Sequence, residues 1–175
     1  MSSESKYARI EWERRFLVDR FPTEAKVTHV RRIVDRYIDG TRLRLRQMIE
    51  SDGTEVLKLT QKISERATGA RQGLITNMYL SREEFDVLTK LPAKVLAKTR
   101  HSVRPFGIDV FDGTLDGLIM AEAEFSSDEE ASSLVIPSFV REEVTDDSRF
   151  AGGSLVAATR DELRTWLADY GMTLE

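Results

Sequence analysis

The sequence predicts an α+β domain in which a closed, eight-stranded antiparallel β-barrel is accompanied by a few flanking helices. Short segments in which polar and apolar residues alternate follow one another along most of the chain. Asp-Gly pairs, which suit the tight turns of hairpins, stand between several of these segments. Because most connections are too short for a parallel crossover, the strands are expected to pair antiparallel.

Nine segments are candidate strands, of which one or two are expected to be merged with a neighbour or not to be strands. The Asp-Gly pairs lie at residues 39–40, 52–53, 112–113 and 116–117. The candidate strands span residues 9–18, 31–38, 42–49, 54–63, 73–80, 99–104, 107–111, 119–125 and 139–145.

Helices are expected at two places. Ser81, followed three residues later by Glu84, forms a capping box, and apolar residues at helical spacing continue from it towards Pro92. A second helix is predicted over residues 161–170. Its apolar stripe consists of Leu163, Trp166, Leu167 and Tyr170. We interpret this stripe as core packing; a seat for a partner chain is the alternative, so a homodimer remains open.

The 175 residues are expected to form one domain, with residues 1–6 as a frayed terminus. A hydrophobic content of 41% is sufficient for a buried core. The absence of cysteine excludes disulfides, thiolate metal sites and cysteine nucleophiles, and the two histidines disfavour a His-rich zinc site. No apolar run approaches the roughly twenty residues of a membrane span and no secretory leader is recognisable, so we expect a cytoplasmic protein without a membrane partner.

Charged residues make up 32% of the chain, against about 25% in an average domain. The 30 acidic and 26 basic residues nearly cancel to a net charge of −4, which argues against nucleic acid or anionic lipid as a partner. The informative feature is their distribution, since residues i and i+2 of a strand share a face. Acidic and basic groups occupy separate strands: Glu11 and Glu13; Arg42, Arg44 and Arg46; Lys58 and Lys62; Lys98 and Arg100; Glu122 and Glu124.

A solvated sheet face is the common reason for such alternation. However, a surface that serves solubility mixes the signs locally, and like charges on one strand face cost stability unless something compensates them. We therefore expect a barrel whose charged face surrounds a water-filled cavity and whose apolar face lies outward under the helices. Carboxylate pairs suit Mg²⁺, and Arg and Lys suit phosphate oxygens, so the pattern predicts a metal–polyphosphate site.

The same strands resemble the motifs of a known family. Residues 10–18 resemble the ExExK opening strand of the CYTH superfamily, the triphosphate tunnel metalloenzymes. The further matches follow in order over about 135 residues. Residues 42–46 resemble the arginine strand, 59–62 the lysine strand, 98–100 the K-x-R element, 121–125 the AEvEl strand and 143–145 the EVT element.

The resemblance implies a tunnel that binds a triphosphate together with Mg²⁺ or Mn²⁺, in a superfamily that includes inorganic triphosphatases, thiamine triphosphatases and class IV adenylyl cyclases. It implies that metal is bound by Glu11, Glu13, Glu122 and Glu124. It implies that phosphate is bound by Arg42, Arg44, Arg46, Lys58, Lys62, Lys98 and Arg100, although Arg42 and Lys58 follow from strand parity as much as from the motifs. Catalytic or assisting roles fall to Arg15, Asp109 and Glu143.

Two departures from the family pattern bear on catalysis. Arg15 stands where the ExExK motif has lysine, so a planar fork replaces a compact ammonium group. The central acidic strand of the family is missing, and Ile75, Asn77 and Tyr79 are aligned in its place.

The predicted function is metal-dependent hydrolysis of a triphosphate, with inorganic tripolyphosphate as the first candidate. A class IV-type adenylyl cyclase and a non-catalytic binding module for polyphosphate or nucleoside triphosphates are the alternatives.

Outside the motifs, Gly152 and Gly153 lack the fingerprint of a phosphate-binding loop and are interpreted as a simple turn.

Overall fold

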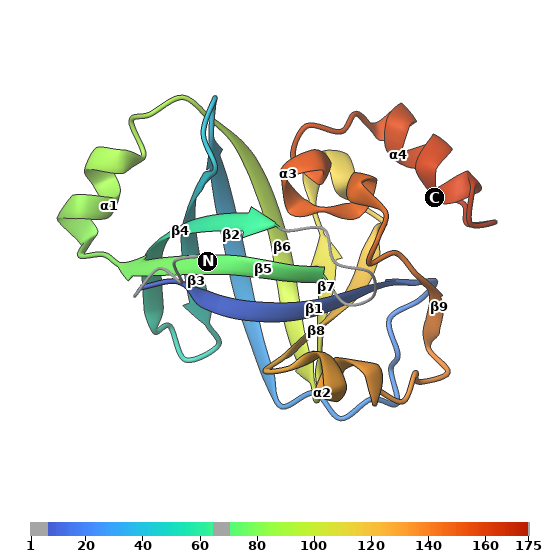
Figure 1. The fold of residues 1–175 in the computed structure, drawn as a ribbon. Coiled ribbons are helices and arrows are strands. Elements are labelled where there is room, and N and C mark those ends of the chain that lie inside the picture. The colour runs from blue at the N-terminus through green and yellow to red at the C-terminus, as the bar shows by residue number, and fades with distance from the viewer. Residues whose placement is uncertain (1–6, 65–70, 175) are drawn as a thin grey trace.

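Nine antiparallel strands form one continuous sheet in residues 7–64 and 71–174, the parts of the chain that the computed structural model describes (Figure 1). Every predicted strand has its counterpart, and residues 1–6, expected to fray, lie outside the described ranges. The strands are β1 (Arg9–Val18), β2 (His29–Ile38), β3 (Leu43–Glu50), β4 (Glu55–Ser64), β5 (Arg71–Tyr79), β6 (Ala93–Val103), β7 (Phe106–Phe111), β8 (Ile119–Phe125) and β9 (Val140–Glu143).

Eight of these strands close into a barrel. The hydrogen-bonded order is β5-β4-β3-β2-β6-β7-β8-β1, and β1 pairs again with β5. The first half of β1 closes the ring, with Glu11 opposite Gly73, whereas its second half pairs with β9, with Phe16 opposite Glu143. The predicted closed barrel of eight antiparallel strands is therefore confirmed, and β9 extends the wall beyond the end of β5.

Turn glycines and strand pairing together set the strand boundaries. Gly40 between β2 and β3 has a φ of 69°, and Gly53 between β3 and β4 has a φ of 85°, which residues with a side chain rarely adopt. β6 begins at Ala93, six residues before the predicted start at 99. The alanine and lysine residues of this segment do not favour a strand, but pairing along the whole of β2 overrides their propensity.

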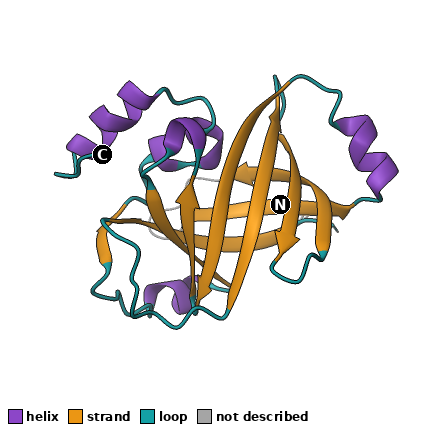
Figure 2. Cartoon of the chain, turned by 180° about the vertical axis from the view of Figure 1, so that it is seen from behind, coloured by secondary structure: helices purple, strands orange, loops and turns teal. Residues whose placement is uncertain are grey.

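Short helices flank the barrel, as the view from behind in Figure 2 also shows. The predicted capping box is present: Ser81 Oγ accepts from the Glu84 N–H at 3.2 Å, and the Glu84 carboxylate accepts from the Ser81 N–H at 2.8 Å. The helical elements of the described residues are α1 (Arg82–Leu88), α2 (Asp128–Ser132), α3 (Gly152–Leu155) and α4 (Arg160–Ala168), with 3₁₀ turns η1 (Gly113–Leu115) and η2 (Ser148–Phe150). None of these helices is long and apolar enough to cross a membrane.

Apolar side chains on the outer face of the barrel are covered by two of the helices. Phe85 of α1 packs on Leu45 of β3 and Leu57 of β4. Ala131 of α2 belongs to a cluster that contains Phe16 and the apolar residues of β7 and β8. This arrangement agrees with the expected outward apolar face, because these residues alternate with the charged ones along each strand.

A third apolar cluster fills one end of the barrel interior. Leu17 shares the inward face of β1 with Arg15, and it packs with Leu96 of β6 and Phe111 of β7. The C-terminal segments add Phe150, Leu155, Leu163 and Leu167, with Trp166 and Tyr170 packed against them. The stripe of α4 is therefore core packing, as predicted, and the charged interior is confined to the rest of the barrel.

Candidate active site

A charged cavity of about 550 Å³ lies inside the barrel and is bordered by α3. This volume falls within the range of about 300–1,000 Å³ that is typical of small-molecule sites. The lining includes Arg9 and Asp35, which no motif singled out. It also brings together twelve predicted site residues: Glu11, Glu13, Arg15, Arg42, Arg44, Arg46, Lys58, Lys62, Lys98, Arg100, Glu122 and Glu124.

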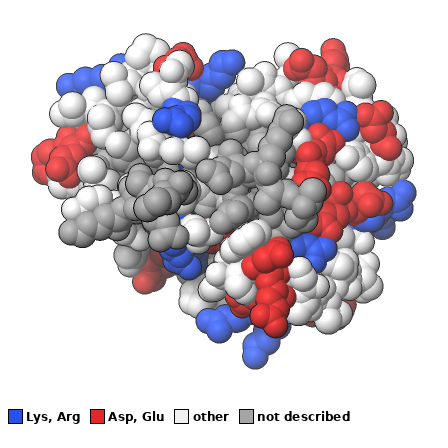
Figure 3. Space-filling view, viewed as in Figure 1, with Lys and Arg blue, Asp and Glu red and all other residues white. Residues whose placement is uncertain are grey.

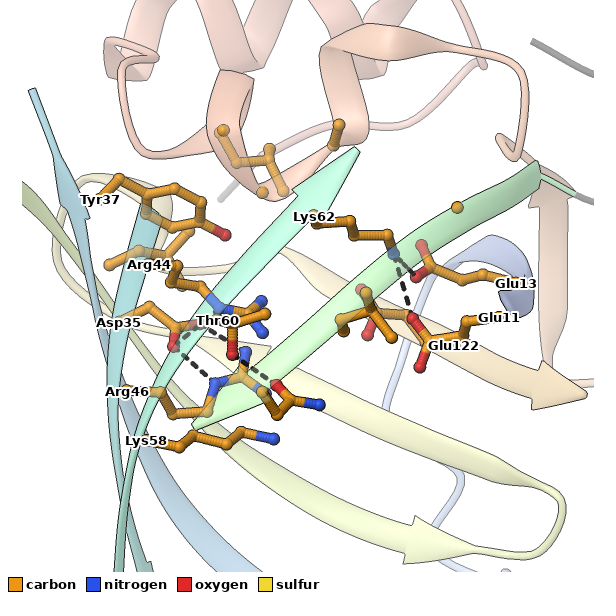
Figure 4. Close-up of a pocket in the computed structure, with 18 of the residues that line it drawn as sticks. Glu11, Glu13, Asp35, Tyr37, Arg44, Arg46, Lys58, Thr60, Lys62 and Glu122 are labelled. Carbon is orange, nitrogen blue, oxygen red and sulfur yellow. Dashed lines mark hydrogen bonds and ion pairs between the residues drawn. The ribbon is translucent and has the colours of Figure 1, made fainter. Parts of the chain in front are cut away.

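The carboxylates of β1 and β8 form the acidic part of the cavity. The register of the two strands places Glu13 opposite Glu124 and Arg15 opposite Glu122. Lys62 of β4 reaches across to this group, and its Nζ lies 2.5 Å from Glu13 Oε2 and 3.5 Å from Glu11 Oε2 (Figure 4). The acidic part is thus bridged by a lysine that the motifs assign to phosphate.

Asp109 lies behind the cavity wall and holds two of the predicted phosphate ligands. Its side chain is fully buried and is directly opposite Arg100 in the β6–β7 ladder. Arg100 donates from Nε and Nη2 to the two carboxylate oxygens at 2.6 Å each, and Lys98 donates from Nζ at 2.5 Å. Asp109 is absent from the described cavity lining, so it contacts Lys98 and Arg100, two predicted phosphate ligands, and not the cavity itself.

Arg100 also donates to Glu122, which connects this group to the acidic part. Burial alone would raise the pKa of Glu122, but the positive charges of Lys98 and Arg100 outweigh it and hold the pKa well below its usual range. Glu124 behaves in the opposite way, since burial and then the charge of Glu11 raise its pKa. The acidic part therefore contains a carboxylate that lacks enough positive charge around it.

Arginines from β3 and a lysine from β4 form the basic part, with Asp35 of β2 among them (Figure 4). Asp35 accepts from Arg46 Nε and Nη2 at 2.6 Å each, and Arg44 Nε lies 3.7 Å from it. Burial lowers the pKa of Lys58, and the neighbouring Arg46 and Arg44 lower it further. The signal that could have identified Asp35 is its parity: it is the acid of β2 that shares the inward face with Tyr37.

Arg15 is anchored to backbone of the C-terminal segment. Its side chain is 3% exposed, and it donates from Nη1 to the Phe150 carbonyl at 2.7 Å and from Nη2 to the Thr145 carbonyl at 2.8 Å. Its Nε lies 3.3 Å from Glu13 Oε1. Both terminal nitrogens are therefore engaged by the protein, and only the Nε edge is directed to the acidic part.

Glu143 lies away from the cavity, on the outer side of β1. It forms a bidentate ion pair with Arg14, at 2.9 Å to Nε and 2.5 Å to Nη2, and accepts from Thr145 Oγ1 at 2.6 Å. This pair explains why a charged residue stands on the mostly apolar face of β1. The structure thus does not bring Glu143 to the other predicted site residues.

The inward face of β5 carries no acid in its described side chains, as the sequence indicated. The cavity-lining residues of this strand are Gly73, Ile75, Asn77 and Tyr79. A Cβ on Gly73 would lie 3.2 Å from Lys62 Cε, so the glycine leaves room for the lysine that bridges the acidic part.

The donor set of the acidic part has the chemistry of a hard-cation site. Four glutamates on two paired strands offer oxygen ligands, which Mg²⁺ and Mn²⁺ prefer, and the raised pKa of Glu124 indicates unbalanced negative charge. In the present arrangement Lys62 engages Glu11 and Glu13, and Arg100 engages Glu122. Accordingly, no group of three or more metal-ligating side chains converges on one point within residues 7–64 and 71–174.

Gly152 and Gly153, expected in a simple turn, instead begin the four-residue helix α3 and line the cavity. A Cβ on Gly152 would overlap the hydroxyl of Tyr37. The turn interpretation was wrong because helix formation here follows from docking on the barrel, which two glycines do not signal.

The chain is similar to several known proteins, although no family model matches it. An inorganic triphosphatase from Nitrosomonas europaea is 30% identical over 153 residues, which cover 83% of this chain and 95% of that protein. A solved structure of an inorganic triphosphatase matches with a TM-score of 0.56 at 26% identity, over 85% of this chain and 95% of the other. A solved structure of a protein described as hypothetical matches with a TM-score of 0.57 at 28% identity, over 85% and 99%.

Proposed function

Because the chain belongs to the CYTH superfamily of triphosphate tunnel metalloenzymes, we propose that it hydrolyses a triphosphate inside the barrel, inorganic tripolyphosphate first. The observation that carries this proposal is the charge of the cavity. Among the described residues, nine basic and five acidic side chains line it, a formal charge of +4 inside a chain of net charge −4. A compact polyanion is the ligand that such a cavity favours.

The basic side chains would bind and orient the phosphate chain. Arg44 and Arg46 offer guanidinium groups that suit bidentate contact with phosphate oxygens, and Lys98 and Arg100 offer further donors that Asp109 holds in place. Donors fixed before the reaction stabilise the charge that develops on the transferred group without a cost of reorganisation.

The acidic part would hold the metal. Glu11, Glu13, Glu122 and Glu124 are the residues proposed to bind Mg²⁺ or Mn²⁺, which when bound supplies charge neutralisation and Lewis acidity at the phosphate. Lys62 and Arg100, which now engage three of these four carboxylates, would then direct their donors toward the phosphate oxygens. The cytoplasmic location and the absence of nucleic-acid and membrane partners stay predictions.

A phosphate-release assay with tripolyphosphate, ATP and thiamine triphosphate, each with Mg²⁺ and with Mn²⁺, tests the proposal. We expect the highest turnover with tripolyphosphate, since the described cavity lining shows no feature specific for adenine. Formation of cyclic AMP from ATP would contradict hydrolysis as the activity. Saturable tripolyphosphate binding without turnover would instead indicate a binding module.

A further inference from the structure

Asp35 is a buried carboxylate within a group of side chains that attract anions. Its side chain is 1% exposed, and in the β2–β3 ladder it lies directly opposite Arg46. Each carboxylate oxygen accepts one hydrogen bond of 2.6 Å from Arg46, and Arg44 Nε lies 3.7 Å away. Burial alone would raise the pKa of Asp35, but the charges of Arg46 and Arg44 bring it to about 2, so the group is ionised at neutral pH.

The same arrangement occurs a second time in the barrel. Asp109 lies directly opposite Arg100 in the β6–β7 ladder, and it also accepts from Nε and Nη2 at 2.6 Å each. In both pairs the aspartate binds the Nε–Nη2 edge of the guanidinium group. For Nη1 of Arg46 and of Arg100, no hydrogen-bond partner is found among the described residues, so these donors remain for a ligand in the cavity.

A negative charge in an anion site weakens anion binding by Coulomb repulsion. Asp35 therefore reduces phosphate affinity unless another effect outweighs its charge. Orientation is such an effect, because an arginine held in its binding rotamer loses less conformational freedom when phosphate binds.

We propose that Asp35 is a positioning residue of the triphosphate site, which holds Arg46 so that its Nη1 is left for the phosphate chain, and which attracts the neighbouring Arg44 by its charge. This inference rests on the proposed function, since it assumes that the cavity binds a triphosphate. It assigns a role to a residue that lies outside every motif of the family resemblance.

The substitution Asp35→Asn keeps the shape of the side chain and removes its charge. Isothermal titration of tripolyphosphate in EDTA would measure binding without metal-dependent turnover. We expect the Kd of the variant to rise at least about tenfold, although the cavity has become more positive. A lower Kd would show that Asp35 acts by charge alone, and an unchanged Kd with a lower Tm would show a purely structural role; either result overturns the proposal.

A double-mutant cycle tests whether Asp35 acts through Arg46. In the Arg46→Gln background, adding Asp35→Asn should change the Kd less than threefold, whereas additive effects would refute the positioning role. This comparison also applies if Asp35→Asn alone fails to fold, because the double variant leaves no unpaired guanidinium at position 46.

Asp112→Asn is the matched control. Asp112 accepts from Arg32 of β2, and both residues lie outside the described cavity lining. This variant should bind tripolyphosphate like the wild type; an equal loss in both variants would contradict a specific role of Asp35. A wild-type protein that neither binds tripolyphosphate nor releases phosphate from it in the presence of Mg²⁺ or Mn²⁺ would refute the proposed function itself, whereas wild-type binding that Asp35→Asn leaves intact refutes only this inference.

Discussion

Replacing Arg15 by lysine restores the residue type of the family motif and tests what this side chain does here. Arg15 donates to the carbonyls of Phe150 at 2.7 Å and Thr145 at 2.8 Å, and its Nε lies 3.3 Å from Glu13. A lysine carries one ammonium group in place of this fork. It therefore cannot reach both carbonyls and Glu13 at once, and at least one buried hydrogen bond is lost.

The expected cost follows from that lost contact. A hydrogen bond to a charged group contributes about 1.5–3 kcal/mol, and a buried carbonyl left without a donor costs about 1–3 kcal/mol. We therefore expect Arg15→Lys to lower the free energy of unfolding by about 2–3 kcal/mol. In a chain of this size each kcal/mol corresponds to roughly 2–4 °C, so the Tm should fall by about 5–10 °C.

Thermal unfolding of the wild type, Arg15→Lys and Arg15→Met measures this effect, with Arg15→Met expected to lose the most because it retains no donor. The kcat and KM for tripolyphosphate with Mg²⁺ are measured beside it. If Arg15 chiefly anchors β1 to the C-terminal segment, the lysine variant keeps its kcat within about tenfold. An unchanged Tm together with a larger change in kcat would refute this reasoning and place Arg15 on the substrate.

Four further predictions concern the cavity. Glu122→Gln should reduce metal-dependent phosphate release by roughly 10- to 100-fold, and equal turnover would remove Glu122 from the metal site. Gly152→Ala, whose Cβ overlaps the Tyr37 hydroxyl, should cost about 1–3 kcal/mol of unfolding free energy, and Tyr37→Ala should relieve that cost; additive losses in thermal unfolding would contradict the clash. The pKa of Asp35 is lowered from the ordinary 3.8 to about 2, which stabilises the folded state by about 2 kcal/mol above pH 3.8. This contribution is lost as the pH falls through 2. The difference in unfolding free energy between the wild type and Asp35→Asn should therefore shrink between pH 3.8 and 2, as measured by acid titrations of unfolding. Chelation by EDTA should abolish phosphate release, and added Mg²⁺ or Mn²⁺ should restore it. The Tm should change little, because Lys62 bridges Glu11 and Glu13 when the metal is absent. Phosphate release that persists in EDTA would contradict metal dependence.

Strand parity was sufficient to predict which side chains meet inside the barrel. The period of two is a local property, so Lys58 and Lys62, or Glu122 and Glu124, can be assigned to one face without knowledge of the partner strands. The pairing of strands is a long-range property. The inward direction of Asp35 follows from its parity with Tyr37, but its pairing with Arg46 depends on the register between β2 and β3, which parity does not give.

Strand parity also did not predict which inward side chains are covered by their neighbours, and a motif match did not predict on which face of the sheet Glu143 lies. Asp109 lies on the inward face as predicted, but the covering side chains of Lys98 and Arg100 keep it out of the cavity. Glu143 was assigned from a motif match alone, and it lies on the outer side with Arg14. A local clue existed, because a charged residue on the apolar face of β1 requires a partner there.

The contrast in charge between the cavity and the rest of the molecule would favour a small polyanion over a large one as the ligand of the proposed function. With +4 in the cavity lining and −4 for the whole chain, the remaining residues carry a formal −8. On the face shown in Figure 3, basic and acidic side chains are interspersed among the described residues. A large polyanion must approach this negative exterior, and within the screening length of about 10 Å at 0.1 M salt it is repelled. A short phosphate chain that fits into a cavity of about 550 Å³ would be surrounded by the basic lining and removed from the negative exterior, so the proposed function predicts that ligand size and charge together, rather than the affinity of any one arginine, determine selectivity.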